Sequence, residues 1–283
     1  MTTETKEEIL PLVEEFEGKP KLWISISSAD QYEKCPRSYK FAKIDKLPKK
    51  RSEHTDVGNF VHETLQLLHN ALNVDSTIEP MGEIKKIAAE LWPKYADFIS
   101  PAGLIKSKTQ LKAYYDYNQK HGWPKVLSTE EKFSIRLSKD VQFSGIVDRF
   151  DEIDDELNNP MVEITDYKTG KSSYLDSFQL AAYGLYLRKR NPELSKKYKG
   201  AYLVLGEGPK KVDYVFTDKD VDKAKKELLE TANEIMSDQT WTPKPTRLCD
   251  YCDFKDACPE AYGKPNLTQI GRTSFKTKEE KAG

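Results

Sequence analysis

Two acidic strand segments on either side of a short turn constrain the fold of this 283-residue chain more than any other feature. Residues 141–150 (VQFSGIVDRF) and 161–168 (MVEITDYK) flank the sequence DDELNNP. Alternating apolar and polar side chains predict half-buried strands, and turn residues between them predict a hairpin that reverses near Leu157. The fold must therefore contain a β-sheet that includes this hairpin.

Apolar periodicity elsewhere predicts helices and more strands. Val61, Leu65, Leu68 and Leu72 lie at i, i+4, i+7 and i+11, which is the pattern of one helix face. A further helix start is expected at Ser27-Ser28-Ala29-Asp30, which resembles an N-cap. Other helices are expected over 80–120 (with a kink or break at Pro93), 175–190 and 218–236, and other strands over 132–137, 200–206 and 211–217. The prediction is an α/β (α+β) fold in which a central mixed sheet is flanked by helices.

The composition excludes several classes of protein. Lys and Arg (45) and Asp and Glu (46) give a net charge of −1, so no overall positive field attracts nucleic acid. A local basic patch could still do so, and Lys43, Lys46, Lys49, Lys50 and Arg51 form one in the sequence. No apolar run approaches the roughly 20 residues of a membrane span, and the acidic start lacks a signal sequence. We therefore expect a soluble cytoplasmic protein that does not bind membranes.

Two carboxylates are predicted to face each other across the hairpin. With a turn near Leu157, paired residue numbers add up to about 314, which places Asp148 opposite Asp166. Carboxylates that close repel each other unless a cation lies between them. Strand alternation puts Asp166 and Lys168 on one face. Another interpretation stays open: Asp166 pairs with Lys168, and Asp148 caps a turn or pairs with Arg149.

Three polar residues on predicted helices can reach the same place. His62 lies at the border of the buried face of its helix, where a packing role is the usual alternative to a ligand role. Gln179 and Tyr183 share a helix face at i and i+4, which by itself is an ordinary amphipathic pattern. Gly145 would let a ligand or backbone come close to the strand.

Together these motifs resemble a known family. Gly58-x3-His62, Gly145-Ile-Val-Asp148-Arg149, Asp166-Tyr-Lys168-Thr-Gly170 and Gln179-x3-Tyr183 are similar in order and spacing to the RecB-like branch of the PD-(D/E)XK nuclease superfamily. The resemblance covers about residues 25–260. It implies a restriction-endonuclease-like core and cleavage of phosphodiester bonds.

The resemblance also implies roles for single residues. His62, Asp148, Asp166 and the backbone carbonyl of Tyr167 would hold Mg²⁺ or Mn²⁺, and the carboxylates are the hard oxygen donors that these ions prefer. Lys168 would position the attacking water or stabilise charge in the transition state. Gln179 and Tyr183 would contact the substrate strand and order the site.

Four cysteines form the second motif. Cys249, Cys252 and Cys258 are close in sequence, whereas Cys35 lies 214 residues before Cys249. The arrangement resembles the iron–sulfur staple of AddB-type and CRISPR-associated nucleases, which implies a [4Fe–4S] cluster. A structural Zn²⁺ site and four unligated thiols remain as alternatives, since thiolates suit both metals.

The resulting hypothesis is a metal-dependent DNA nuclease, specifically an exonuclease acting on single-stranded ends in recombination, repair, CRISPR or phage DNA processing. A helicase or recombination or CRISPR protein is the expected partner. The alternatives are an inactive DNA-binding or structural iron–sulfur module and an RNA-directed nuclease. The expected organisation runs from a flexible leader (1–20) through a nuclease domain (21–262), with a helical insertion (75–125) and a cluster-binding segment (241–260), to a disordered polar tail (263–283).

Overall fold

A computed structural model describes residues 16–154, 160–170, 175–190 and 197–261. The chain divides into two compact units. The first comprises residues up to Ser25 and Ser52–Glu230, and the second comprises Ile26–Arg51 and the segment from Thr231 onward. The predicted leader and tail fall mostly outside the described residues, and so does the turn at Leu157.

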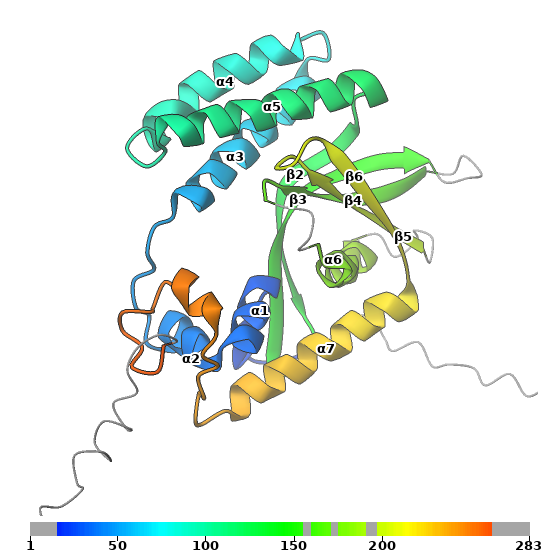
Figure 1. Cartoon of the computed structure of the whole chain (residues 1–283). Coiled ribbons are helices and arrows are strands. Elements are labelled where there is room, and N and C mark those ends of the chain that lie inside the picture. Colours follow the sequence, from blue (N-terminus) through cyan, green and yellow to red (C-terminus); the bar gives the residue numbers. More distant parts are fainter. Residues whose placement is uncertain (1–15, 155–159, 171–174, 191–196, 262–283) are drawn as a thin grey trace, which may run out of the picture. The chain divides into compact units, whose positions relative to one another are not determined.

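The first unit is built on a six-stranded mixed sheet (Figure 1). Its strands are β1 (Leu22–Ile24), β2 (Lys125–Arg136), β3 (Val141–Asp154), β4 (Pro160–Lys168), β5 (Lys197–Val204) and β6 (Lys210–Thr217). The order is β1-β3-β4-β5-β6, and β2 also pairs with β3. β1 is parallel to β3 and β4 is parallel to β5, while the other pairs are antiparallel. The expected mixed central sheet is confirmed.

Three helices cover one face of this sheet: α3 (Glu53–Val74), α4 (Pro80–Tyr95) and α5 (Pro101–His121). Their apolar residues form a core with Tyr167 and Leu203 of the sheet. Tyr114 is fully buried in this core. Pro93 lies inside α4, so the predicted break does not occur there and the helix continues to Tyr95.

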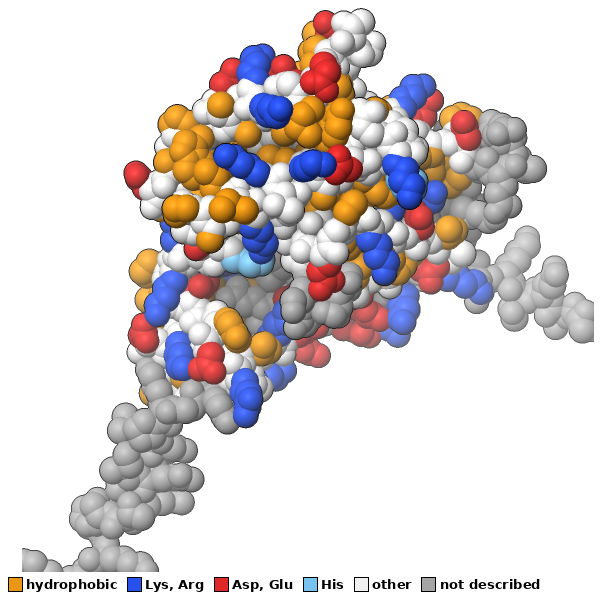
Figure 2. Space-filling view, turned by 45° about the horizontal axis from the view of Figure 1, so that its top comes forward, with side chains coloured by type: hydrophobic (Ala, Val, Ile, Leu, Met, Phe, Trp, Pro, Cys, Tyr) orange, Lys and Arg blue, Asp and Glu red, His pale blue; other side chains and the backbone are white. Residues whose placement is uncertain are grey.

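A groove lies open between α4 and α5, and its volume is about 870 Å³. Ile84, Trp92 and Leu104 are among its apolar lining residues, and Lys85 and Lys108 are among its basic ones. Figure 2 shows apolar side chains and lysines gathered on one face of the protein.

The other face of the sheet packs against α6 (Ser177–Arg190). Leu180 fills the space beside Gly200 of β5, and the ring of Tyr183 packs against Phe133 of β2. α7 (Asp218–Ser237) buries Val221, Ala224 and Leu228, as the predicted apolar stripe requires. The boundary between the two units falls within α7, after Glu230.

The second unit contains short helical segments: α1 (Ile26–Lys34), α2 (Pro36–Tyr39), η1 (Lys40–Ile44) and η3 (Arg247–Tyr251). The rings of Tyr39 and Trp241 stack at 6.0 Å, and the Tyr32 hydroxyl donates a hydrogen bond to Asp238 at 3.1 Å. These contacts join the N-terminal and C-terminal segments of the unit.

Two local predictions were wrong. α1 begins at Ile26, so Ser27–Asp30 lie inside the helix instead of capping it. α3 begins at Glu53, eight residues before Val61, the first residue of the apolar pattern that predicts this helix. Its first three residues are polar and exposed, but Val57 and Phe60 are buried and extend that pattern. None of the helices in the described ranges is long and apolar enough to cross a membrane.

Candidate active site

The central strands β3 and β4 separate where their acidic residues lie. The register of β3 and β4 is the predicted one: Arg149 is opposite Thr165, and these residue numbers add up to 314. The paired residues end there, one residue short of Asp148 and Asp166. The Asp148 carboxylate crosses the gap and accepts a hydrogen bond from the backbone N–H of Tyr167 at 2.7 Å. The two predicted carboxylates therefore lie directly beyond the end of the ladder.

Helix α3 brings His62 to this place. Its Nδ1 atom lies 3.4 Å from Asp148 Oδ2 and 4.0 Å from Glu130 Oε1. Among the described residues, His62, Glu130 and Asp148 form the one group that offers three ligand atoms within 4.8 Å of one another. The ligand role predicted for His62 is thus compatible with its position.

Glu130 was missed in the sequence. The register of β2 and β3 places it opposite Asp148, because Thr129 pairs with Arg149 and Glu131 pairs with Val147. Its φ angle is +48°, in the left-handed region that a glutamate rarely adopts, and such strain is concentrated at functional sites. The sequence alone offers two adjacent glutamates, and only the register and the backbone conformation distinguish them.

Asp166 and Lys168 form the other half of the site. Lys168 Nζ lies 2.7 Å from Asp166 Oδ2 and donates to Gln179 Oε1 at 3.0 Å. Gln179 Nε2 donates to Asp166 Oδ1 at 2.7 Å and to the Tyr183 hydroxyl at 3.1 Å. The four residues predicted on β4 and α6 are therefore connected in one network. The interpretation of Asp166 and Lys168 as an ion pair is also satisfied by this geometry, so the pair alone does not define the function.

One sequence interpretation near the site needs correction. The space beside Gly145 is filled by the aromatic ring of Phe133, which lies 2.7 Å from the position that a Cβ atom would occupy there, and not by a ligand. The side chain of Tyr167 lies on the opposite face of β4 from Asp166, in contact with Arg149. A ligand role for the Tyr167 carbonyl stays a prediction.

The ionisable groups of the site shift one another's pKa values. Burial raises the pKa of Asp166, the charge of Asp148 raises it further, and it reaches about 7 although Lys168 and His62 oppose the shift. Burial lowers the pKa of His62, but Asp148, Asp166 and Glu130 outweigh this and raise it to about 9. Burial and the charge of Asp148 raise the pKa of Glu130. These groups therefore hold protons more firmly than usual, as expected where several carboxylates surround a space suited to a cation.

The donor set fits a hard divalent cation. It consists of carboxylate oxygens and one imidazole nitrogen, a combination that binds Mg²⁺ and Mn²⁺ and excludes soft metals that require thiolates. Asp166 Oδ2 is buried and lies 2.7 Å from the Lys168 ammonium. A bound cation would lower the repulsion among the acids.

Comparisons with known proteins define the class. The family described as the PD-(D/E)XK nuclease superfamily matches residues 23–259, which is most of the chain. The chain belongs to this superfamily and is a nuclease by family.

Solved structures show a similar fold. One described as "Putative exonuclease" from Eubacterium rectale is 12% identical and has a TM-score of 0.50, and the match covers 88% of this chain and 93% of that one. The structure described as SSO0001 is 15% identical with a TM-score of 0.40, and the match covers 86% and 88%. At 12% identity, the likeness to the Eubacterium rectale structure concerns the fold alone. A search of curated proteins found no match.

The four cysteines are brought together in the second unit. They line one small pocket, together with residues such as Ser38 and Phe254. Thiolate ligands suit both zinc and an iron–sulfur cluster, so the cysteine-lined pocket is compatible with either metal group.

Proposed function

We propose that this nuclease is a RecB-like, metal-dependent deoxyribonuclease that degrades DNA from single-stranded ends and carries a [4Fe–4S] cluster. The observation that carries the metal-dependent activity is the convergence of His62, Glu130 and Asp148 beside the pair of Asp166 and Lys168. The DNA substrate and the exonuclease mode are supported by the resemblance of the four motifs to the RecB-like branch.

The residues of the site have different proposed roles in the reaction. His62, Glu130, Asp148 and Asp166 would hold Mg²⁺ or Mn²⁺, which supplies a water of lowered pKa and neutralises charge on the phosphate. Lys168 can orient a water or stabilise negative charge on the phosphate, because Gln179 fixes its ammonium. Gln179 links Lys168, Asp166 and Tyr183, so it keeps the ammonium and the carboxylate in a defined geometry.

The cluster and the partner belong to the same proposal. Cys35, Cys249, Cys252 and Cys258 would bind the cluster, which has a structural role. The net charge of −1 provides little general attraction for DNA, so we propose that a helicase or another recombination or CRISPR protein delivers opened ends.

The decisive experiment uses end-labelled linear single-stranded DNA, duplex DNA and single-stranded RNA, together with internally labelled circular single-stranded DNA. Each substrate is incubated with Mg²⁺, with Mn²⁺ or with EDTA, and product lengths are followed over time. We expect linear single-stranded DNA to be shortened from an end only with metal, while circular DNA stays intact. Cleavage of circles would show an endonuclease, preferred cleavage of RNA would overturn the DNA assignment, and cleavage in EDTA would overturn metal dependence.

The matched inactive control is Asp148→Asn, which keeps the side-chain size and removes the charge. We expect it to bind DNA and to cleave at least about 100-fold more slowly, the scale of losing one electrostatic stabiliser. Cleavage by this variant at the wild-type rate would show that the activity comes from a contaminant or another site.

A further inference from the structure

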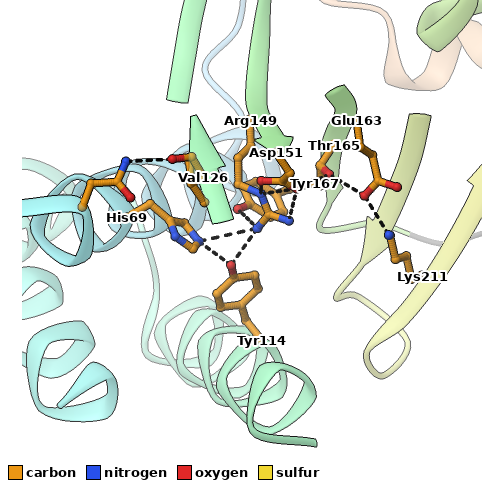
Figure 3. Close-up of polar contacts among 10 residues, drawn as sticks. His69, Tyr114, Val126, Arg149, Asp151, Glu163, Thr165, Tyr167 and Lys211 are labelled. Carbon is orange, nitrogen blue, oxygen red and sulfur yellow. Dashed lines mark hydrogen bonds and ion pairs between the residues drawn. The ribbon is translucent and has the colours of Figure 1, made fainter. Parts of the chain in front are cut away.

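A buried polar cluster lies on the face of the sheet opposite Asp166, and Figure 3 shows its contacts. Its centre is Arg149, which directly follows Asp148 on β3 and is 4% exposed. Arg149 Nη1 donates to the hydroxyls of Tyr167 at 2.7 Å and Tyr114 at 2.8 Å. Its Nε and Nη2 atoms donate to Asp151 Oδ2 at 3.0 and 2.8 Å. One guanidinium thus joins β3, β4 and helix α5.

The cluster is balanced in charge and rich in hydrogen bonds. Asp151 neutralises Arg149 and also accepts a hydrogen bond from Thr165 Oγ1 at 2.9 Å. Burial, together with Arg149, lowers the pKa of His69, so this histidine is neutral beside the guanidinium. Buried ionic clusters of this kind usually add little stability compared with apolar packing, and their best-attested role is to fix one arrangement.

The arrangement that needs fixing is the end of the β3–β4 ladder. Beyond the pair of Arg149 and Thr165, the pairing between these strands ends. Two hydrogen bonds of Tyr167 connect the strands there. Its backbone N–H binds Asp148 on one side of the sheet, and its hydroxyl binds Arg149 on the other.

We propose that the hydrogen bond between Arg149 and Tyr167, here called the back clamp, positions Asp148 and Asp166 for metal binding. The clamp ties the residue after Asp148 to the residue after Asp166, and so it sets the spacing of the two carboxylates against their mutual repulsion. Arg149 and Tyr167 are positioning residues whose side chains never touch the metal. The inference rests on the proposed metal-dependent function.

Substitution of tyrosine by phenylalanine tests the clamp with a matched control. Tyr167→Phe and Tyr114→Phe each remove one hydroxyl that accepts from the same Nη1 atom, and each keeps its buried ring. Of the two tyrosines, only Tyr167 lies on a strand that carries a carboxylate of the site, since β4 also contains Asp166. Tyr114 lies on α5 and anchors Arg149 from the side of the helices.

Metal binding is measured first on protein without DNA, by calorimetry with Mn²⁺ and with Mg²⁺. We expect Tyr167→Phe to weaken metal binding by about 10–100-fold, as for other groups that orient metal ligands. The loss should be larger for Mg²⁺, which demands near-ideal octahedral geometry. Tyr114→Phe should change the affinity less than about threefold. In cleavage assays, kcat of Tyr167→Phe should fall at fixed metal concentration while KM for DNA stays constant.

Several results would overturn the clamp. Equal losses of thermal stability in both variants, with unchanged metal affinity in both, would show a purely structural cluster. Arg149→Lys gives a second route, because it keeps the charge next to Asp151 but loses the fork that reaches both partners, and we expect the same metal defect. If the wild type binds no metal and cleaves nothing, the proposed function and the clamp both fail. If the wild type does both and Tyr167→Phe matches it, only the clamp fails.

Discussion

Asp166 is a carboxyl group that the fold destabilises in its charged form. Burial and the nearby charge of Asp148 raise its pKa to about 7, whereas an unfolded chain leaves it near its ordinary value of 3.8. The folded state therefore binds the proton more firmly, and without metal the stability falls as the pH rises through this interval. His62 acts in the same direction, since its pKa is raised from 6.5 to about 9.

This predicts the behaviour of Asp166→Asn, which cannot ionise. Without metal, we expect the wild type to unfold at a lower temperature at pH 8 than at pH 5, and the variant to show a smaller difference. At pH 8 the variant should be more stable than the wild type by several degrees, since each kcal/mol shifts Tm by about 2–4 °C at this size. Thermal unfolding followed by circular dichroism in EDTA measures this. A variant less stable than the wild type at pH 8 would mean that the ion pair with Lys168 outweighs the repulsion.

The two neighbouring glutamates of β2 allow a second test at the residue scale. Glu130→Gln removes a charged oxygen from the group with His62 and Asp148, so metal affinity should fall by at least about tenfold. Glu131→Gln is the control, because Glu131 accepts from Tyr186 and pairs with Arg190 away from that group. It should lower stability and leave metal binding unchanged. Calorimetry measures the metal affinity of both variants, and an equal loss of affinity in both would remove Glu130 from the ligand set.

At the scale of elements, the segment after β4 depends on its neighbours. The Leu205 N–H donates to the Lys168 carbonyl at 2.8 Å, and Gln110 of α5 donates to the Thr169 carbonyl at 2.8 Å. Gly206 has no room for a side chain, since a Cβ there would lie 2.6 Å from the Thr169 carbonyl oxygen. β5 and α5 therefore hold the backbone that carries Lys168.

Gly206→Ala should consequently disturb Lys168 without changing any polar group. The added methyl meets backbone atoms, which cannot rotate away, so the segment at Thr169 must shift. Shifts of about 1 Å near a reacting group can cost 100-fold in rate, and we expect a loss of that order in kcat. Gly170→Ala is the control, because a Cβ there has no neighbour within 4 Å. Single-turnover cleavage rates of the two variants are compared, and equal rates would show that the contact of Gly206 with the backbone does not position Lys168.

The sequence predicted most elements of the fold for physical reasons, and the roles of the site residues that it proposed stay predictions. Strand alternation and the turn residues were enough to predict the register of β3 and β4, which brings Asp148 near Asp166. Helix periodicity placed Gln179 next to Tyr183. Glu130 could not be found in this way, because its role comes from an irregular backbone conformation at a point that periodicity does not identify. β1 was missed because three residues are too short for a periodic pattern.

At the scale of the molecule, the second unit is assembled from distant parts of the chain. Residues Ile26–Arg51 supply Cys35, and the segment after Thr231 supplies the other three cysteines. Burial raises the pKa of the Cys258 thiol, so this group needs a cation to become a thiolate at neutral pH. Metal binding at such a site contributes directly to folding.

Cys35→Ala should therefore behave like Cys252→Ala, although the two residues are 217 positions apart in the sequence. Anaerobically purified wild type should be brown with about four iron atoms per chain, and both variants should lose colour and thermal stability. Iron analysis, visible absorption and thermal unfolding measure this. Colourless wild type that contains zinc would contradict the cluster, and a Cys35→Ala variant with full metal content would remove Cys35 from the ligands.

The division of the second unit between two ends of the fold also sets an order for biosynthesis. During translation, residues 26–51 leave the ribosome long before the segment from Thr231. Cys35 is therefore without the other three cysteines while the whole nuclease sheet is synthesised. The sheet and its acidic site can fold during synthesis, because domains generally form as units from the N-terminus. The four thiols meet only when Cys258 has emerged. Loading of the proposed cluster would thus be a late step of maturation, and a shortage of iron would then leave nascent chains with a folded sheet and an incomplete second unit.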